Sequence, residues 1–398
     1  MGSRPPEPGR YVRAGRGGPL THLLVTNDFP PKVGGIQSYL WELWRRLDPA
    51  RFEVLTTAHP EAADFDARQP FKIHRSTETQ FLPTPRMVRA IKAQITESRP
   101  DLVVLDPAVP IGLAGPHLGR PYALVLHGAE VTVPGRIPVT RQLLGHVLRR
   151  AVHIVAAGGY PAAEGERAAG AGRMPPVTVI PPGIDGVRFH PLAPGERSAA
   201  RQRFGVSEHA RVVSSVSRLV PRKGMDVLIY ASAVLAREFP DLVVLISGEG
   251  RDRDRLEKKI DATSAPVRLL GAVDNADLPA LYGCSDVFAM LCRNRWAGLE
   301  QEGFGIVFLE AAACGVAQVA GQSGGSAEAV LDGRTGLVVG DPRRAEGPDG
   351  AAAALRSLLA DAGLRSRLGT GARQRVLHEL SYDLLAARLG EALATVGG

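Results

Sequence analysis

Two basic residues in the second half of the chain are spaced so that they could hold one anionic ligand. Arg218 and Lys223 lie on either side of Pro221, and Gly224 follows directly. If this segment follows a strand, both cations lie near the strand's carboxyl end, where they could neutralise a diphosphate leaving group. The alternative is a pair of solvated surface charges, because most charged residues are exposed.

Two carboxylates further along, Glu302 and Glu310, flank the expected start of a helix near Gly305. Glu302 would then lie in the preceding loop and Glu310 about a turn and a half inside the helix. The amides of residues 303–305 would lie at the positive helix end, where an anionic group or hydroxyls could dock. No HxH, DxD or cysteine cluster accompanies the acids, so we expect no metal.

Loops near the start of the chain add two further candidates. His127 ends the apolar run YALVLH beside Glu130, where it could donate to a hydroxyl or share a proton, or simply serve as a structural residue. Gly34 and Gly35 precede an amphipathic helical pattern, which predicts an anion cradle or, alternatively, a plain glycine turn. The nucleotide-binding patterns GxxxxGK[ST] and GxGxxG are both absent, since Arg253 replaces the third glycine of GEGRDR.

The elements that must position these residues follow one pattern twice. Short β-branched runs such as THLLVTND, YALVLHG, RVVSSVSR and LVVLISGEG alternate with helical segments. This is typical of α/β folds with a doubly wound parallel sheet. We expect a disordered basic tail over 1–18 and Rossmann-like domains over 19–190 and 191–380, with a helix at about 381–398 that could pack back on the first domain. Ligands of such sheets bind beyond the carboxyl ends of the strands.

Composition narrows the classes of partner. The 398 residues are 44% hydrophobic, and no apolar run reaches the roughly 18 residues of a membrane helix. The net charge of +7 suits nucleic acid, anionic lipid or a phosphate-bearing substrate, but 5% aromatic residues and no known module argue against nucleic acid. Three cysteines fit neither a zinc site nor an even disulfide framework, which favours a reducing cytoplasm.

A segment without acidic residues, from Val131 to Ala163, suggests a lipid surface. Its arginines accompany an apolar set, and a basic amphipathic helix of this kind can rest on an anionic membrane. The alternative is a helix packed on its own sheet with a solvated basic edge. The residues concerned are Arg136, Arg141, Arg149 and Arg150, with Ile137, Leu143, Leu144, Val147 and Leu148.

Four motifs together resemble the family 4 retaining glycosyltransferases of the GT-B fold. They are GGIQS at 34–38, HGAE at 127–130, SRLVPRKG at 217–224 and the two glutamates at 302 and 310. The resemblance runs from about residue 20 to the end of the chain. It implies two Rossmann-like domains facing each other across a cleft, transfer of a sugar from a nucleotide donor, and no metal.

The resemblance also assigns roles to residues. Arg218 and Lys223 would bind the donor diphosphate, Glu310 the ribose hydroxyls and Glu302 the hydroxyls of the transferred sugar, with His127 beside that sugar. All of these except Glu310 are expected to act in catalysis. The other expected ligand contacts are Gly34, Gly35, Gly248, Gly250, Arg251, Val273, Gly303, Phe304 and Gly305.

Within that family, the chain looks most similar to mannosyltransferases that act on phosphatidylinositol mannosides. This implies GDP-mannose as donor, a lipid-linked acceptor mannosylated at the inositol 6-position, and a cytoplasmic enzyme held peripherally on the inner face of the plasma membrane. No nucleic-acid or protein partner is expected. A front-face substitution, in which the leaving diphosphate helps to deprotonate the acceptor, is the implied mechanism. The alternatives are a relative with a soluble acceptor and a nucleotide-sugar-binding protein without turnover.

Overall fold

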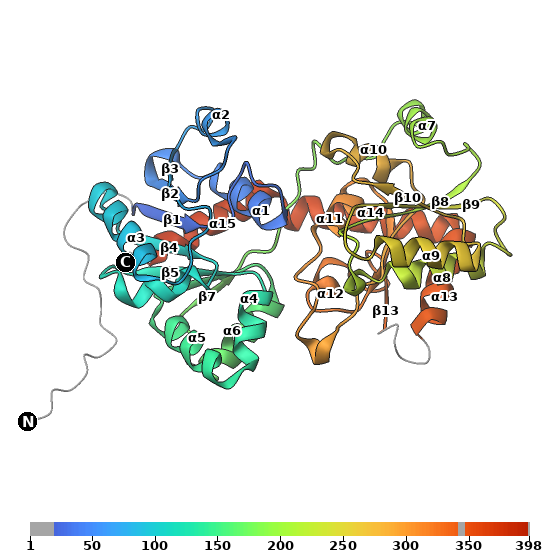
Figure 1. Ribbon diagram of the computed structural model, residues 1–398. Coiled ribbons are helices and arrows are strands. Elements are labelled where there is room, and N and C mark those ends of the chain that lie inside the picture. The colour runs from blue at the N-terminus through green and yellow to red at the C-terminus, as the bar shows by residue number, and fades with distance from the viewer. Residues whose placement is uncertain (1–19, 341–346, 397–398) are drawn as a thin grey trace, which may run out of the picture. The chain divides into compact units, whose positions relative to one another are not determined.

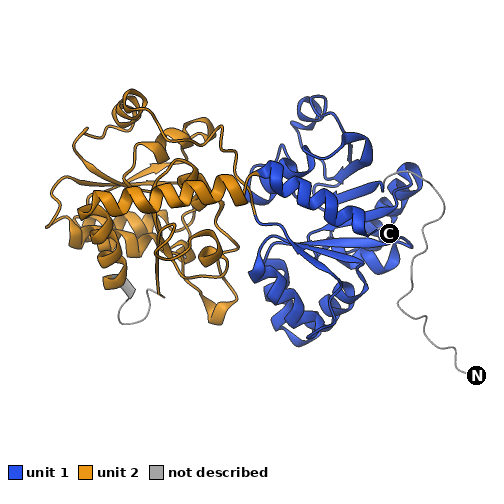
Figure 2. Cartoon of the chain, turned by 180° about the vertical axis from the view of Figure 1, so that it is seen from behind, with its two compact units in different colours: residues 1–181, 382–398 blue, residues 182–381 orange. Residues whose placement is uncertain are grey.

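The computed structural model describes residues 20–340 and 347–396 and divides the chain into two compact units (Figures 1 and 2). The first unit comprises Met1–Pro181 and Tyr382–Gly398, and the second comprises Pro182–Ser381. The boundary between the two units falls after Pro181, whereas the boundary predicted from the sequence falls after residue 190. The basic tail expected over 1–18 lies outside the described residues.

The first unit contains a parallel sheet of seven strands within the described residues, in the order β3-β2-β1-β4-β5-β6-β7. Its strands are β1 (His22–Thr26), β2 (Phe52–Thr56), β3 (Lys72–Arg75), β4 (Leu102–Asp106), β5 (Tyr122–Leu126), β6 (His153–Ala156) and β7 (Val177–Val179). The strand order reverses direction between β1 and β4. In open α/β sheets, ligands bind beyond the carboxyl ends at this switch point.

Helices cover both faces of this sheet. They are α1 (Gly35–Trp44), α2 (Ala62–Asp66), α3 (Pro85–Ser98), α4 (Ala129–Arg136), α5 (Pro138–Arg150), α6 (Gly159–Ala169) and α15 (Tyr382–Thr395), with 3-10 turns η1 (Pro49–Arg51) and η2 (Ile111–His117). Helices α4, α5 and α6 pack side by side (Figure 1). Although α15 follows the whole second unit in sequence, it packs on α1 in the first unit, and Leu385 and Leu389 are fully buried there.

The second unit repeats the architecture with six parallel strands in the order β10-β9-β8-β11-β12-β13. Its strands are β8 (Arg211–Val216), β9 (Leu242–Ser247), β10 (Val267–Gly271), β11 (Val287–Met290), β12 (Ala317–Gly321) and β13 (Leu337–Val339). Its helices are α7 (Pro194–Arg203), α8 (Met225–Leu235), α9 (Arg253–Thr263), α10 (Leu278–Gly283), α11 (Ile306–Ala313), α12 (Ser326–Ala329), α13 (Gly347–Ala360) and α14 (Ala362–Glu379), with 3-10 turns η3 (Pro221–Lys223), η4 (Asn275–Asp277) and η5 (Trp296–Gly298).

The strands fold in this way because their residues are apolar on both faces. Every residue of β1, β4 and β5 is buried, as is every residue of β11 and β12. Strands covered on both sides read as continuous apolar runs, whereas strands with one solvated face alternate. The prediction of two doubly wound parallel sheets is therefore confirmed. None of the described helices is long and apolar enough to cross a bilayer.

Candidate functional site

A buried cluster of charged side chains lies at the carboxyl edge of the second unit's sheet. Lys223 ends η3, which follows β8, and its Nζ lies 2.7 Å from Oε2 of Glu302. Nη1 of Arg222 donates to the same oxygen at 2.6 Å. The cluster lies at the switch point of this sheet, because Glu302 follows β11 in the chain and the strand order reverses between β8 and β11.

Glu302 is held in its ionised form by this arrangement. Burial opposes ionisation, but the adjacent charges of Lys223 and Arg222 outweigh it and lower the pKa of Glu302 to about 2. Sγ of Cys292 also approaches the same carboxylate oxygen, at 3.6 Å. An ionised carboxylate is a strong hydrogen-bond acceptor, so Glu302 could bind the hydroxyl groups of a ligand. Lys223 and Arg222 could bind an anionic group of the same ligand.

The loop that carries Lys223 is fixed by glycine. Gly224 has φ of 71°, and a Cβ there would lie 1.8 Å from the carbonyl oxygen of Leu291. Gly248, with φ of 132°, approaches the backbone of Ser217 in the same way, because a Cβ there would lie 1.9 Å from the carbonyl oxygen of Ser217. Gly248 therefore has a packing role in addition to its expected contact with the ligand, because only glycine fits this close approach.

The loop before α11 is hydrogen-bonded to the loop that contains Ser323 and Gly325. The backbone N–H of Glu302 donates to Oγ of Ser323 at 3.1 Å, and the N–H of Gly325 donates to the carbonyl of Glu302 at 3.0 Å. Gly305 caps α11 with φ of 91°. Phe304, which precedes Gly305, is buried in the core of the second unit.

Glu310 lies inside α11 with partners of its own. The hydroxyl of Tyr282 donates to Oε2 of Glu310 at 2.6 Å. Burial raises the pKa of Glu310, and the Tyr282 hydrogen bond and the charge of Arg188 oppose that shift. The two glutamates therefore have separate surroundings: Glu302 lies among cations and Glu310 beside a phenol.

Three other expected ligand residues lie in nearby loops. Arg218 is exposed, and within the described part of the chain no side chain pairs with its guanidinium. Arg251 is likewise exposed, and Val273 is half-buried against a small cluster of the second unit. Their roles in ligand binding remain predictions, as do those of Gly250 and Gly303.

The first unit has its own polar cluster at the carboxyl ends of β1, β4 and β5. Nε2 of His127 lies 2.5 Å from Oδ1 of Asp106, the last residue of β4, and Oγ1 of Thr26 donates to the other carboxylate oxygen at 2.7 Å. Oε1 of Glu130 accepts the N–H groups of His127 and Gly128 at the start of α4. The expected position of His127 at a strand end beside an acid therefore has a geometric basis.

The glycine loop at the start of α1 belongs to the same unit. No side chain caps the first turn of α1, so the amides that follow Gly34 and Gly35 are free of a capping side chain. Nε2 of Gln37 in this turn donates to Oδ1 of Asp28 at 2.7 Å. Uncapped amides of this kind favour an anion, and the role of Gly34 and Gly35 as a phosphate cradle remains a prediction.

Sequence reasoning missed three residues that the structure places in these clusters. Arg222 pairs with Glu302, Asp106 pairs with His127, and Asp28 contacts Gln37. Each had a signal: Arg222 precedes Lys223, while Asp28 follows an apolar strand and Asp106 ends one, at the edge where polar ligands of a parallel sheet gather.

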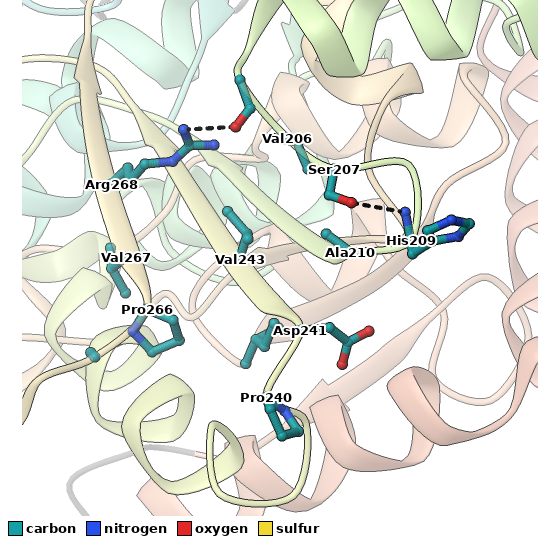
Figure 3. Close-up of a pocket in the computed structure, with 13 residues that line it drawn as sticks. Val206, Ser207, His209, Ala210, Pro240, Asp241, Val243, Pro266, Val267 and Arg268 are labelled. Carbon is teal, nitrogen blue, oxygen red and sulfur yellow. Dashed lines mark hydrogen bonds between the residues drawn. The ribbon is translucent and has the colours of Figure 1, made fainter.

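A cavity of about 540 Å³ lies elsewhere in the second unit, at the amino ends of β8, β9 and β10 (Figure 3). Ala210, Asp241 and Pro266, which directly precede these strands, line it. It contains none of the expected site residues. Ligands of open α/β sheets bind at the opposite edge, so in the second unit the charged cluster around Glu302, and not this cavity, is the candidate site.

Comparisons with known proteins agree with the geometry. Residues 33–188 match the model of Glycosyltransferase Family 4, and residues 196–375 match that of Glycosyl transferases group 1. The structure of Anabaena HepE in complex with UDP superposes with a TM-score of 0.79 at 22% identity, covering 94% of this chain and all of that one. This structural likeness concerns the fold, which is that of a GT-B glycosyltransferase.

The chain belongs to the family 4 glycosyltransferases and is a glycosyltransferase. It is 37% identical over 384 residues to the GDP-mannose-dependent alpha-(1-6)-phosphatidylinositol monomannoside mannosyltransferase of Mycolicibacterium smegmatis, covering 94% of this chain and 98% of that protein. A monoacylated alpha-(1-6)-phosphatidylinositol monomannoside mannosyltransferase of Corynebacterium glutamicum, also GDP-mannose-dependent, is 35% identical over 93% of this chain and 97% of its own length. The enzyme class and the family expected from the motifs are confirmed.

Proposed function

We propose that this chain transfers mannose from GDP-mannose to the inositol 6-position of a phosphatidylinositol mannoside, with retention of configuration. The observation that carries the proposal is identity of 35 to 37% over almost the whole chain to enzymes named for this donor and acceptor. The charged cluster of the second unit suits such a donor, since paired cations stabilise the charge that develops on a leaving diphosphate.

In this proposal each residue of the cluster binds a different part of the donor. Lys223 and Arg222 provide fixed positive charge, and the exposed Arg218 side chain joins them when a diphosphate binds. Glu302 accepts hydrogen bonds from the sugar hydroxyls and Glu310 from the ribose. The leaving diphosphate accepts the acceptor's proton as the new bond forms on the same face of the sugar.

Purified protein tests the donor and the acceptor together. Radiolabelled GDP-mannose should label phosphatidylinositol monomannoside in vesicles, whereas UDP-sugars as donors and free inositol or sugars as acceptors should give little product. Labelling of a soluble acceptor instead would favour a different member of the family. Hydrolysis without transfer to any acceptor, or binding without turnover, would contradict the proposal.

We further propose that the reaction needs no metal. In the described ranges, no group of three or more His, Cys, Asp or Glu side chains could hold a metal ion. The positive charge needed at the diphosphate is available from Arg222 and Lys223 instead. The rate in excess EDTA should equal the rate in magnesium, and a rate that falls on chelation and returns with added metal would contradict this.

A surface on α4 and α5 supports the proposal that the enzyme works as a peripheral protein on an anionic membrane, at the inner face of the plasma membrane. Val133 and Ile137 are exposed, and Val139 and Leu143 are 79% and 51% exposed. Of the apolar set noted in the sequence, Leu144, Val147 and Leu148 are buried in the core instead. The alternative of a helix packed on its own sheet is therefore correct for those three, while the exposed four form the membrane surface of this proposal.

The arginines around this surface are not equivalent. Arg136 pairs with the buried Glu164 at 3.3 Å, and Nη1 of Arg149 donates to the carbonyl of Ala169 at 2.8 Å. Nη2 of Arg141 donates in the same way to the carbonyl of Arg167 at 3.2 Å. Arg150 is exposed, and each cation near an anionic surface contributes roughly 1 kcal/mol to binding. We therefore assign the electrostatic part of the contact chiefly to Arg150.

Vesicle flotation tests this surface. Val139→Asp combined with Leu143→Asp should weaken binding to vesicles that contain anionic phospholipid and leave binding of GDP unchanged. Val187→Asp is the matched control, because Val187 is 87% exposed but lies in the second unit. Equal flotation of the double variant and the control would remove this surface from the proposal.

A further inference from the structure

Asp106 is a buried carboxylate, and each of its two oxygens contacts a neighbouring side chain. Its side chain is fully buried at the end of β4. Oδ1 lies 2.5 Å from Nε2 of His127, and Oδ2 accepts the hydroxyl of Thr26 at 2.7 Å. Buried polar atoms need hydrogen-bonding partners within the protein, and each oxygen of Asp106 has one.

The other groups around His127 are also acidic or neutral. Glu130 accepts the backbone N–H of His127, and Asp28 lies near enough to act on the imidazole electrostatically. The ring of Tyr39 packs edge-on against the imidazole, with 5.5 Å between centroids. Lys32 acts electrostatically on Asp28, but its Nζ is engaged by the carbonyl of Asn27 and the hydroxyl of Thr57, to which it donates. The surroundings therefore favour a positively charged imidazole.

The pairing also decides which nitrogen of His127 is left for a ligand. Nε2 faces Asp106, so Nδ1 is the remaining ring nitrogen. Within residues 20–340 and 347–396, no hydrogen bond to Nδ1 is formed, and 9% of the side chain is exposed. A carboxylate on one imidazole nitrogen fixes both the ring's orientation and what the other nitrogen can do.

We propose that Asp106 is a positioning residue that holds His127 as a cationic donor, with its Nδ1–H free to donate to an oxygen of the substrate. This deepens the proposed function and rests on it. A cationic imidazole has no lone pair, so His127 does not act as the base that deprotonates the acceptor. It instead stabilises a hydroxyl or phosphate oxygen that gains negative charge during transfer.

The ionisation of His127 agrees with this geometry. Burial disfavours the charged imidazole, but the charge and the hydrogen bond of Asp106, helped by Glu130 and Asp28, outweigh burial and raise the pKa of His127 to about 9. At neutral pH the ring would therefore carry both protons. An unpaired histidine would lose one of them near pH 6.5.

Nuclear magnetic resonance of ¹⁵N-histidine-labelled protein tests the pairing without any substrate. The signals of His127 are assigned by their loss in His127→Gln. In the wild-type protein its ring should titrate at about pH 9, and Asp106→Asn should lower that value by about one to three units. Glu53→Gln is the matched control, because Glu53 pairs with His74 at 2.8 Å on β2 and β3, away from His127, and it should leave the titration of His127 unchanged.

Kinetics give the second readout. The wild-type rate should change little from about pH 6 to about pH 8, whereas Asp106→Asn should lose activity across that range as His127 loses its proton. A wild-type His127 that titrates near its ordinary value, or identical pH profiles for wild type and Asp106→Asn, would overturn the inference. If no sugar is transferred from GDP-mannose, the proposed function fails, but the titration still decides the Asp106 pairing.

Discussion

Nζ of Lys223 and Oε2 of Glu302 lie 2.7 Å apart in a buried pair, so the cation expected to bind the donor already has an anionic partner within the protein. Arg222 shares that partner. Two cations on one carboxylate leave positive charge for a ligand, while the carboxylate fixes both side chains in place. Such preorganisation is what makes fixed charge effective in a site from which water is excluded.

Lys223→Ala should lower turnover by about 100-fold, which corresponds to about 3 kcal/mol for the loss of one preorganised charge. Steady-state kinetics with GDP-mannose would measure this loss. Arg356→Ala is the control, because Arg356 pairs with Glu238 at 2.8 Å on the surface of the second unit and should leave turnover unchanged. Near-normal turnover of the Lys223 variant would remove this lysine from the diphosphate site.

Glu302 should make the free energy of unfolding depend on pH in the acidic range. Its pKa, lowered from 4.5 to about 2, means that the folded chain binds fewer protons than the unfolded chain in this range. The contribution is therefore complete above about pH 4.5 and is lost as the pH falls towards 2. Glu302→Gln should lower the free energy of unfolding by about 3 kcal/mol at neutral pH, and the difference from wild type should shrink in acid.

Calorimetry at neutral pH and at about pH 3 would measure this convergence. Glu238→Gln provides the comparison, because its pair with Arg356 is exposed and should add little at either pH. A constant difference between Glu302→Gln and wild type at both pH values would contradict the assignment of the stabilising charge to Glu302.

Tyr282→Phe should weaken the binding of GDP by about tenfold without unfolding the second unit. The ring is fully buried and would keep its packing, but Glu310 would lose the hydroxyl that donates to it at 2.6 Å. A hydrogen bond contributes roughly 0.5 to 1.5 kcal/mol, and the upper end of this range corresponds to about tenfold in affinity. Titration calorimetry with GDP would show the change, and unaltered affinity would mean that Glu310 does not depend on Tyr282.

Tyr122→Phe is the matched variant for this measurement. Its hydroxyl donates to the carbonyl of Val147 at 2.7 Å in the first unit. It should lower stability to a similar degree and leave GDP binding as in the wild type. A loss of GDP affinity in both variants would point to general destabilisation.

Gly224→Ala and Gly119→Ala separate backbone strain from a steric clash. The two glycines have φ of 71° and 69°, but a Cβ at Gly224 would lie 1.8 Å from the carbonyl oxygen of Leu291, whereas nothing lies within 4 Å at Gly119. Gly119→Ala should cost about 1 kcal/mol. Gly224→Ala should cost clearly more and also weaken donor binding, because it displaces the loop that carries Lys223. Thermal denaturation and GDP titration would compare them, and equal costs would contradict the clash.

The alternation of apolar strands with helices was enough to predict both sheets, because a parallel strand buried on both faces has a continuous apolar sequence. It could not separate Leu143, which is exposed, from Leu144, which is buried. The helical period identifies a face of α5 but does not say how widely the sheet and α6 cover it. Only the packed structure divides those side chains.

The candidate site was predicted in part for a related reason. Strand ends pointed to His127 and to the loop of Lys223, since both follow from local sequence. The pairing of Asp106 with His127 depends on β4 lying next to β5 in the sheet, and that adjacency depends on the tertiary fold. Arg222 and Glu302 pair across 80 positions of the chain, so their contact also depends on the tertiary fold.

The position of α15 affects how the protein is made. This helix supplies Leu385 and Leu389 to the apolar face that also contains Leu40 and Trp44. During translation that face stays uncovered until residues 382–395 have left the ribosome, whereas the second unit is one continuous stretch that can fold earlier. The first unit is thus completed after the second, and a nascent chain halted before Tyr382 would present an apolar surface to chaperones.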